Sequence, residues 1–172
     1  MGKVTTAQGG NLLLLGRRGQ ACKSDSSSTR RSRCVSCLFY AIEDNPDDVI
    51  FLKRAFDSSC CDLKVFGDVQ AAIGAINDPE LEYPNVLLVD LNLPGATGIE
   101  LIKAARNHKR TKTVPVVVLS SSSYQGDIDS AYAAGASSYV VKPVDYAELE
   151  AAIKTIAEYW GTINAPANGD AR

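Results

Sequence analysis

The chain has 172 residues, a length that favours one well-buried domain and does not favour a second. Hydrophobic residues make up 45% of it and charged residues 22%, as in ordinary globular proteins, and no apolar run approaches the ~20 residues that a membrane span requires. The net charge is −2, but seven of the 18 basic residues lie in residues 1–36 with a single acidic one. The remainder is acidic, which argues against nucleic acid as a direct partner.

Residues 1–33 are rich in Gly, Ser and Arg and lack hydrophobic periodicity, so we expect a disordered basic extension there. The same composition is compatible with a transit-like leader, although no clear amphipathic helix is present. Met1 is the only methionine of the chain, so a wrongly assigned start site is a further explanation. The sequence leaves these alternatives open.

Five cysteines, an odd number without the spacing of a disulfide framework, favour a reducing, cytoplasmic setting. Cys34 and Cys37 form a CxxC motif, which can indicate metal or redox chemistry. In a strand, however, their odd separation sends the two side chains to opposite faces, so they cannot easily share one ion. We therefore interpret them as buried structural thiols, and we find no functional signal in Cys60 and Cys61.

From residue 34 onward, short apolar runs alternate with helical patterns, which predicts an α/β domain over residues 34–160 followed by a tail over 161–172. Five such units predict a parallel sheet with helices on both faces. The strands are expected near residues 35–42, 63–66, 86–90, 114–119 and 138–141. The helices are expected near residues 46–59, 69–77, 98–108, 127–134 and 146–160.

Local signals mark several of these helix ends. Proline suits the first helical position, a Thr or Asp followed three residues later by Glu indicates a capping box, and glycine commonly ends a helix. The signals fall at Pro46, at Thr97 with Glu100, at Asp145 with Glu148, and at Gly135 and Gly161.

Polar side chains follow four of the expected strands. Glu43 and Asp44 follow the first strand, Asp90 the third, Ser120 the fourth and Lys142 the fifth. In open α/β sheets, ligands bind in the crevice beyond the carboxyl ends of the strands. We therefore expect acids, a hydroxyl and an amine to converge on one rim of the sheet.

The chemistry of these groups suits phosphoryl transfer. Carboxylates as close as Glu43, Asp44 and Asp90 repel one another unless they share a cation, and oxygen ligands with open water positions suit Mg²⁺. Lys142 would place a positive charge, and Ser120 a donor hydroxyl, on phosphoryl oxygens. Together they predict a magnesium-dependent site at which the Asp90 carboxylate attacks a phosphoryl group.

Each of these residues also has an ordinary structural explanation. Glu43 and Asp44 could belong to a polar loop with a helix cap, and Asp90 could form an Asx turn. Ser120 could be one of four consecutive loop serines, and Lys142 a solvated charge. Their joint occurrence at four strand ends, in the required order, favours the functional interpretation.

Four segments resemble the receiver domain of two-component response regulators, over about residues 35–160: IEDNPDD, LLVDLNLPGATGIEL, VPVVVLSSSS and GASSYVVKPVD. The resemblance implies a flavodoxin-like sheet with strand order 2-1-3-4-5. It also implies that Asp90 is the phosphoacceptor, and that Mg²⁺ is bound by the acidic pair, by Asp90 and by a backbone carbonyl. In this sequence the pair is Glu43 and Asp44, and the carbonyl is that of Asn92.

The resemblance also implies how the site would switch. Ser120 matches the switch hydroxyl, Tyr139 the switch aromatic and Lys142 the lysine of the site. The Lys142–Pro143 bond is expected to be cis, as in relatives, which would turn the lysine into the site. Asn92 and Ser122, two residues beyond the acceptor and the switch hydroxyl, are expected to flank the water that hydrolyses the acyl phosphate.

We interpret the chain as a single-domain response regulator that accepts a phosphoryl group from a histidine kinase and signals by protein contacts, since no output domain follows residue 160. It would not be an enzyme beyond self-catalysed phosphotransfer and autodephosphorylation. His108 lies near a helix C-terminus, where an imidazole commonly interacts with carbonyl groups, so the phosphodonor is expected on another protein. Tyr159 and Trp160 resemble the tail of small regulators that partner phytochrome-type kinases, and they make a homodimer conceivable. Such a pair also commonly packs against its own domain.

Two rival interpretations differ in class. A pseudo-receiver, which is a phosphorylation-independent interaction module, would share the fold, but the retention of every site residue speaks against it. A haloacid dehalogenase-type enzyme also uses an aspartate nucleophile at a strand end. It needs a second acid two positions later, where this chain has Asn92.

Overall fold

The computed structural model describes residues 37–167, which fall within one compact unit, Arg33–Arg172. Five parallel strands pair in the order β2-β1-β3-β4-β5, so the expected flavodoxin-like topology is confirmed. The expected extension over 1–33, Cys34 and the last residues of the tail lie outside the described part. The strands are β1 (Cys37–Ile42), β2 (Cys61–Phe66), β3 (Val86–Val89), β4 (Val116–Ser120) and β5 (Ser138–Val141).

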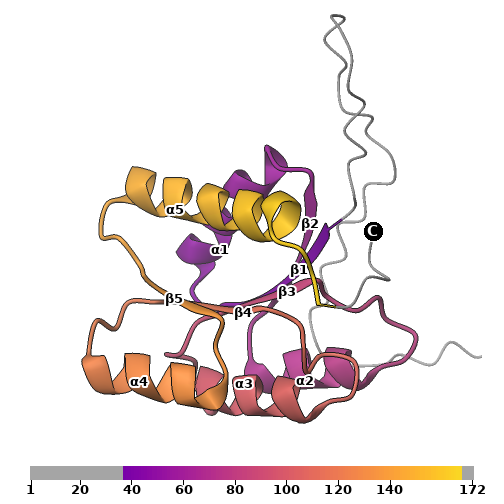
Figure 1. Cartoon of the computed structure of the whole chain (residues 1–172). Helices are drawn as coiled ribbons and strands as arrows, with labels where there is room; N and C mark the ends of the chain where they lie inside the picture. The colour runs from indigo at the N-terminus through magenta and orange to yellow at the C-terminus, as the bar shows by residue number, and fades with distance from the viewer. Residues whose placement is uncertain (1–36, 168–172) are drawn as a thin grey trace, which may run out of the picture. The chain divides into compact units, whose positions relative to one another are not determined.

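Five helices cover the two faces of this sheet. Helices α1 and α5 lie on one face, and α2, α3 and α4 lie on the other (Figure 1). None of the helices in the described part of the chain is long and apolar enough to span a membrane. Their bounds are α1 (Pro46–Asp57), α2 (Val69–Asn77), α3 (Gly98–Asn107), α4 (Gln125–Ala134) and α5 (Tyr146–Glu158), and a π-helical turn, η1 (Tyr159–Ile163), continues α5.

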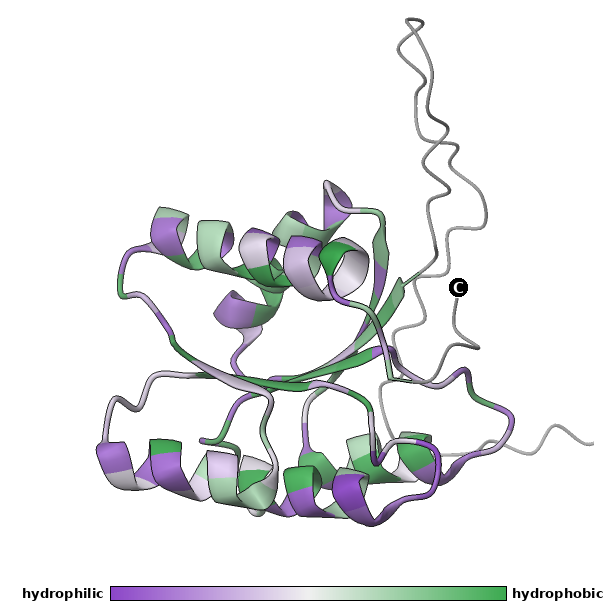
Figure 2. Ribbon diagram, in the orientation of Figure 1, coloured by the Kyte–Doolittle hydropathy of each residue, from purple (hydrophilic) through white to green (hydrophobic). Residues whose placement is uncertain are grey.

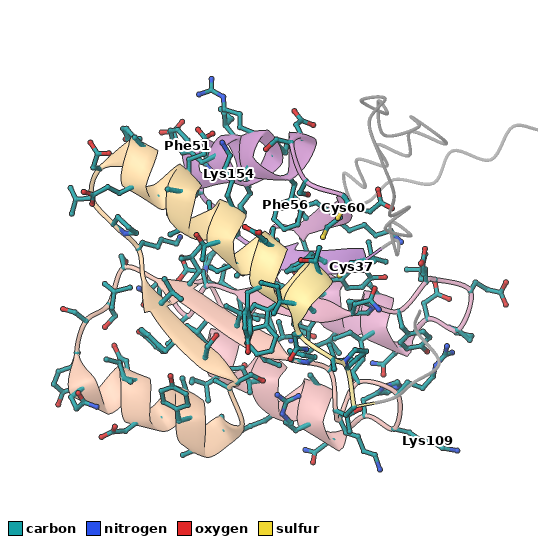
Figure 3. All side chains as sticks on the ribbon, turned by 45° about the horizontal axis from the view of Figure 1, so that its top comes forward. Cys37, Phe51, Phe56, Cys60, Lys109 and Lys154 are labelled. Atoms are coloured by element: carbon teal, nitrogen blue, oxygen red, sulfur yellow. The ribbon has the colours of Figure 1, made fainter. Side chains whose placement is uncertain are left out.

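The two faces of the sheet build two cores. All residues of β1, β3 and β4 are buried, as expected for central parallel strands, and these strands form an apolar layer between the helices (Figure 2). Along β1, Tyr40 belongs to the core under α2 and α3, whereas Phe39 belongs to the core under α1 and α5. On this second face Phe56 of α1 meets Phe39, and Phe51 stacks on Tyr146 of α5 with ring centroids 4.6 Å apart. Figure 3 labels Phe51 and Phe56 of α1.

Three of the predicted helix ends have the expected form. Pro46 is the first residue of α1, and the side chain of Asn45 caps the helix by accepting from the Asp47 amide at 2.9 Å. The Asp145 carboxylate accepts from the backbone amides of the first turn of α5. Gly135 ends α4 with φ 107°, a left-handed conformation that suits glycine.

The other two predictions held only in part or were wrong. Thr97 is the N-cap residue of α3, as expected, but the capping box predicted there does not form. The side chain of Thr97 makes no capping hydrogen bond, and only its backbone carbonyl accepts from the Glu100 amide, at 3.0 Å. Gly161 does not end a helix, because the chain continues through it as η1. A Cβ atom on Gly161 would overlap the Cys61 sulfur, so close packing against β2 explains this glycine better than a helix stop does.

The cysteines of the described chain gather where β1 and β2 begin. Cys37 and Cys61 are register partners on these strands and both are buried, whereas Cys60 is exposed. Cys37 and Cys60 are labelled in Figure 3. The thiol hydrogen bond with Cys37, together with burial, raises the pKa of Cys61. The Cys61 thiol also donates to the carbonyl of Ala157 in α5, at 3.7 Å. These contacts agree with a structural role for the buried thiols.

Candidate functional site

The strand ends bring the predicted side chains to one edge of the sheet. Glu43 follows β1, Asp90 follows β3, Ser120 ends β4 and Lys142 follows β5. Backbone hydrogen bonds hold the neighbouring ends together, because the Asp90 amide donates to the Ile42 carbonyl at 3.1 Å and the Lys142 amide to the Ser120 carbonyl at 2.8 Å. The site is therefore anchored on the most buried part of the fold.

The ammonium group of Lys142 is the centre of the site. Its Nζ lies 2.6 Å from Glu43 Oε2, 2.7 Å from Asp90 Oδ2 and 2.7 Å from Asp48 Oδ2. An ammonium group has three protons, so each can be donated to a different carboxylate. The Lys142 side chain is only 9% exposed, so these pairs are largely shielded from water.

Burial and these contacts set the charge states in the site. Burial alone would lower the pKa of Lys142, but the hydrogen bonds to Asp48, Asp90 and Glu43 outweigh it, and the pKa of the lysine is raised. Burial raises the pKa of Glu43, and Lys142 offsets that effect only in part. The lysine is therefore firmly charged, whereas Glu43 holds its proton more tightly than an exposed glutamate.

The prediction of a cis peptide bond before Pro143 was wrong, since no cis peptide bond occurs among the described residues. The physical reason is that the trans connection already carries the lysine into the site. The Lys142 amide is held on Ser120, and its side chain then reaches Glu43 and Asp90.

Asp48 is a member of the site that sequence reasoning missed. It lies in the first turn of α1 beside Asp47, and both acids suit a helix N-terminus, so the sequence does not distinguish them. The orientation of α1 distinguishes the two acids, because Asp48 is half-buried and faces Lys142, whereas Asp47 is exposed. Asp44, which was predicted beside Glu43, lies exposed at the rim.

The two oxygens of Asp90 have different partners. Oδ2 accepts from Lys142, and Oδ1 accepts from the Asn92 amide at 3.0 Å, which is the geometry of an Asx turn. Gly98 shapes the same loop, since a Cβ atom there would overlap the backbone carbonyl of Asp90. The start of α3 can therefore approach the carboxylate closely, a requirement that sequence reasoning did not identify.

Ser120 is fully buried at the end of β4, and its hydroxyl is contacted from two loops. The side-chain amide of Asn92 lies 3.4 Å from Ser120 Oγ and 3.3 Å from Ser121 Oγ. The Ser122 amide also points to Ser120 Oγ, at 3.4 Å. Asn92 itself is exposed, so its amide covers the serine from the solvent side.

Tyr139 connects β5 to the loop after β4. Its ring is half-buried against the core under α2 to α4, and its hydroxyl donates to the Ser122 carbonyl at 2.9 Å. The Ser122 hydroxyl in turn donates to Asp127 of α4 at 2.5 Å. The chain of contacts therefore runs from the tyrosine through this loop to α4.

The donor set of the site suits a hard cation. Oxygens of Glu43, Asp48 and Asp90 converge on one point, which the Lys142 ammonium occupies, and carboxylate oxygens are the ligands that Mg²⁺ prefers. Within residues 37–167, no group of three or more His, Cys, Asp or Glu side chains is arranged to hold a metal ion as it stands. A cation would therefore need the lysine to give up part of its contacts, with Asp44 available at the rim.

Comparison with known proteins identifies the same region. The model of the response regulator receiver domain matches residues 39–154. The probable methanogenesis regulatory protein FilR2 of Methanothrix harundinacea is 30% identical over 128 residues, which cover 72% of this chain and 83% of that protein.

Solved structures of similar fold include two response regulators. The phosphorylated cyanobacterial phytochrome response regulator RcpA superposes with a TM-score of 0.74 at 25% identity, over 77% of this chain and 99% of that one. The Mn²⁺-bound form of response regulator Rcp1 superposes with a TM-score of 0.72 over the same shares, and its 23% identity supports the fold alone.

Proposed function

The chain belongs to the response regulator receiver domain family of two-component systems, and on that premise we propose that it accepts a phosphoryl group from a histidine kinase on Asp90. The observation that carries the proposal is the cluster in which Lys142 joins the Asp90 carboxylate to Glu43 and Asp48 at the strand ends. RcpA, a relative of similar fold, is described as phosphorylated.

The proposed step is an attack by an Asp90 oxygen on the phosphorus of a phosphohistidine. The new O–P bond forms an acyl phosphate as the P–N bond breaks, and the bond electrons leave with the imidazole of the kinase. Lys142 would hold one phosphoryl oxygen and the Ser120 hydroxyl would donate to another. The hydrogen bond from the Asn92 amide to Asp90 Oδ1 supports this role, because it would limit rotation of the attacking carboxylate.

A divalent cation, which we take to be Mg²⁺, would be held by Glu43, Asp44, Asp90 and the backbone carbonyl of Asn92. It would supply positive charge that offsets the repulsion between the carboxylates and the incoming phosphoryl group. The oxygen-only donor set supports this assignment, and the related fold of Rcp1 is described in a Mn²⁺-bound form.

Signalling would then depend on protein contacts. We take the kinase to be of the phytochrome type, because RcpA is described as a phytochrome response regulator and spans the same fold. The acidic character of the chain beyond residue 36 disfavours direct contact with nucleic acid. The proposed setting is the cytoplasm, where the thiols of Cys37, Cys60 and Cys61 would stay reduced.

Intact-mass analysis after incubation with acetyl phosphate tests the proposal. We expect the wild type to gain the mass of one phosphoryl group in the presence of Mg²⁺ and to lose this gain in chelator. Asp90→Asn should show no mass gain. In Asp44→Ala, the extent of phosphorylation should no longer depend on the Mg²⁺ concentration over the range in which the wild type responds to it. An equal gain in chelator, or in Asp90→Asn, would overturn the assignment. A folded wild type that is never phosphorylated would point instead to a phosphorylation-independent interaction module.

A further inference from the structure

Three carboxylates form ion pairs with Lys142, and Asp48 is the one of these three to which the proposed function assigns no role. We propose that Asp48 is a positioning residue that keeps the Lys142 ammonium in the site while Asp90 is being phosphorylated. The inference rests on the proposed function of Asp90 and adds a residue to it, since neither the acidic pair nor the phosphoacceptor includes Asp48.

In the structure, the Lys142 ammonium group lies at nearly equal distances from three carboxylates. The distances from Nζ to Glu43, Asp48 and Asp90 are 2.6, 2.7 and 2.7 Å, so no partner dominates by distance. The side chains of Glu43 and Asp90 are 4% and 8% exposed, and that of Asp48 is 18% exposed. All three pairs are shielded enough for charge-assisted hydrogen bonds to matter.

Two of these three partners must change during the reaction. The Asp90 carboxylate loses its negative charge when one of its oxygens bonds to phosphorus, and Glu43 would share its charge with the divalent cation. Both changes weaken their attraction for the ammonium at the moment when it has to meet the phosphoryl group. Asp48 takes part in neither change, so it is the partner that can hold the lysine in place.

The position of Asp48 on a helix suits this task. It lies in the first turn of α1, where the helix N-terminus stabilises a carboxylate, and α1 is packed on the sheet through Leu52, Ala55 and Phe56. A lysine side chain has four carbons with large rotamer freedom, so a fixed anchor reduces the number of unproductive positions. Asp48 would therefore act on the reaction only through Lys142.

Asp47 provides a matched control for Asp48. Both residues are aspartates in the first turn of α1, and both substitutions to Asn remove one charge from the same turn. Asp47 is exposed, whereas the carboxylate bonded to Lys142 is that of Asp48. A difference between Asp48→Asn and Asp47→Asn therefore reports the lysine contact and not the overall charge.

The test is the rate of phosphorylation by acetyl phosphate at saturating Mg²⁺, with Mg²⁺ affinity measured separately by calorimetry. Asp48→Asn should be roughly tenfold slower than Asp47→Asn, since the loss of a charge-assisted hydrogen bond is worth about one factor of ten or more. Asp48→Glu, which keeps the charge, should recover part of the rate. Circular dichroism during thermal unfolding should show that all variants are folded at the assay temperature.

A double-mutant cycle with Lys142→Ala separates positioning from other roles. If Asp48 acts through the lysine, Asp48→Asn should cause no further slowing in the Lys142→Ala background. Equal slowing in both backgrounds would overturn the inference, as would equal rates for Asp48→Asn and Asp47→Asn. If excess Mg²⁺ restores the phosphorylation rate of Asp48→Asn to that of the wild type, Asp48 is a metal ligand, and this result would also overturn the inference. Failure of the wild type to be phosphorylated on Asp90 would instead count against the proposed function.

Discussion

We predict that Asn92 influences the lifetime of an acyl phosphate on Asp90. Its exposed side chain spans from the loop after β3 to Ser120 and Ser121 at the end of β4, while its backbone amide donates to Asp90 Oδ1. Asn92→Arg would replace a short amide by a longer side chain at the approach of water. We expect phosphorylated Asn92→Arg to decay several-fold more slowly, because hydrolysis needs a water in line with the phosphorus.

The decay is measured by intact mass after removal of the phosphodonor. Ser122→Glu, the second substitution near the expected water, should also alter the rate of dephosphorylation. The Ser122 hydroxyl is hydrogen-bonded to Asp127, and the carboxylate of the new glutamate would repel that aspartate. Unchanged decay in both variants would show that these residues do not border the reacting water.

The loop that carries Asp90 requires a glycine at position 98, because there is no room for a side chain there. A Cβ atom there would overlap the Asp90 carbonyl and would lie 2.9 Å from Val89 Cγ1 and 3.0 Å from Leu91 Cα. We expect Gly98→Ala to lower the free energy of unfolding by about 1–3 kcal/mol, because the backbone of the loop cannot give way as a flexible side chain could. Phosphorylation of Asp90 should slow in parallel.

Gly74 in α2 is the matched control for this substitution. A Cβ atom on Gly74 would meet nothing within 4 Å, and the residue is exposed in the helix. Gly74→Ala should raise the free energy of unfolding by about 0.5–1 kcal/mol through helix propensity alone. Denaturant titration of both variants checks the pair, and a Gly98→Ala variant as stable as wild type would contradict the close approach of α3.

At the scale of single residues, the sequence was sufficient where a strand end fixes the position. Glu43, Asp90, Ser120 and Lys142 could be predicted on one rim because each directly follows or ends a buried parallel strand. Asp48 and Gly98 could not be predicted in the same way. Their roles depend on how α1 and α3 are rotated against the sheet, which local patterns do not encode.

At the scale of elements, the connection between β4 and α4 is the part most ready to respond to phosphorylation. Tyr139 and Asp127 hold this loop through the carbonyl and the hydroxyl of Ser122, while the Ser122 amide points to the Ser120 hydroxyl at the other end of the loop. A phosphoryl group that draws in the Ser120 hydroxyl would pull on this loop. Tyr139 is already half-buried, so we expect its hydrogen bond to the loop to change and not a long movement from the surface.

Hydrogen exchange tests this response with beryllofluoride as the phosphoryl mimic. We expect altered exchange in residues 120–142 of the wild type and a smaller change in Ser120→Ala, which lacks the hydroxyl. Asp90→Asn serves as the control without an acceptor. The same exchange with and without the mimic in the wild type would show that the switch does not operate.

The elements themselves could largely be predicted from periodicity, and their ends depended on contacts that periodicity does not show. β2 begins at Cys61, two residues before its apolar run, because its pairing with β1 extends to Cys37. β4 begins at Val116, after a proline that cannot donate a backbone hydrogen bond. The π-helical turn after α5 was unpredictable, since it depends on the fit of Gly161 against Cys61.

At the scale of the whole molecule, the exposed apolar side chains near β5 and α5 are the surface that a second copy could use. Val141, Tyr146 and Tyr159 are 41%, 60% and 46% exposed. Trp160 differs from its neighbour, because it packs against the core under α1 and α5. Of the aromatic pair at the end of α5, Tyr159 is therefore the residue available for contacts between molecules.

We expect phosphorylation to favour a homodimer through this surface, since the loop that we expect to respond to Asp90 is joined to β5 by Tyr139. Sedimentation over a range of concentrations should show stronger association in the presence of beryllofluoride, and Ser120→Ala should reduce the difference. Tyr159→Ser should weaken association and leave thermal stability nearly unchanged, whereas Trp160→Ala should lower stability, because only Trp160 packs on the core. If the association state is the same in all of these conditions, the surface must serve a different protein, and the dimer has to be abandoned.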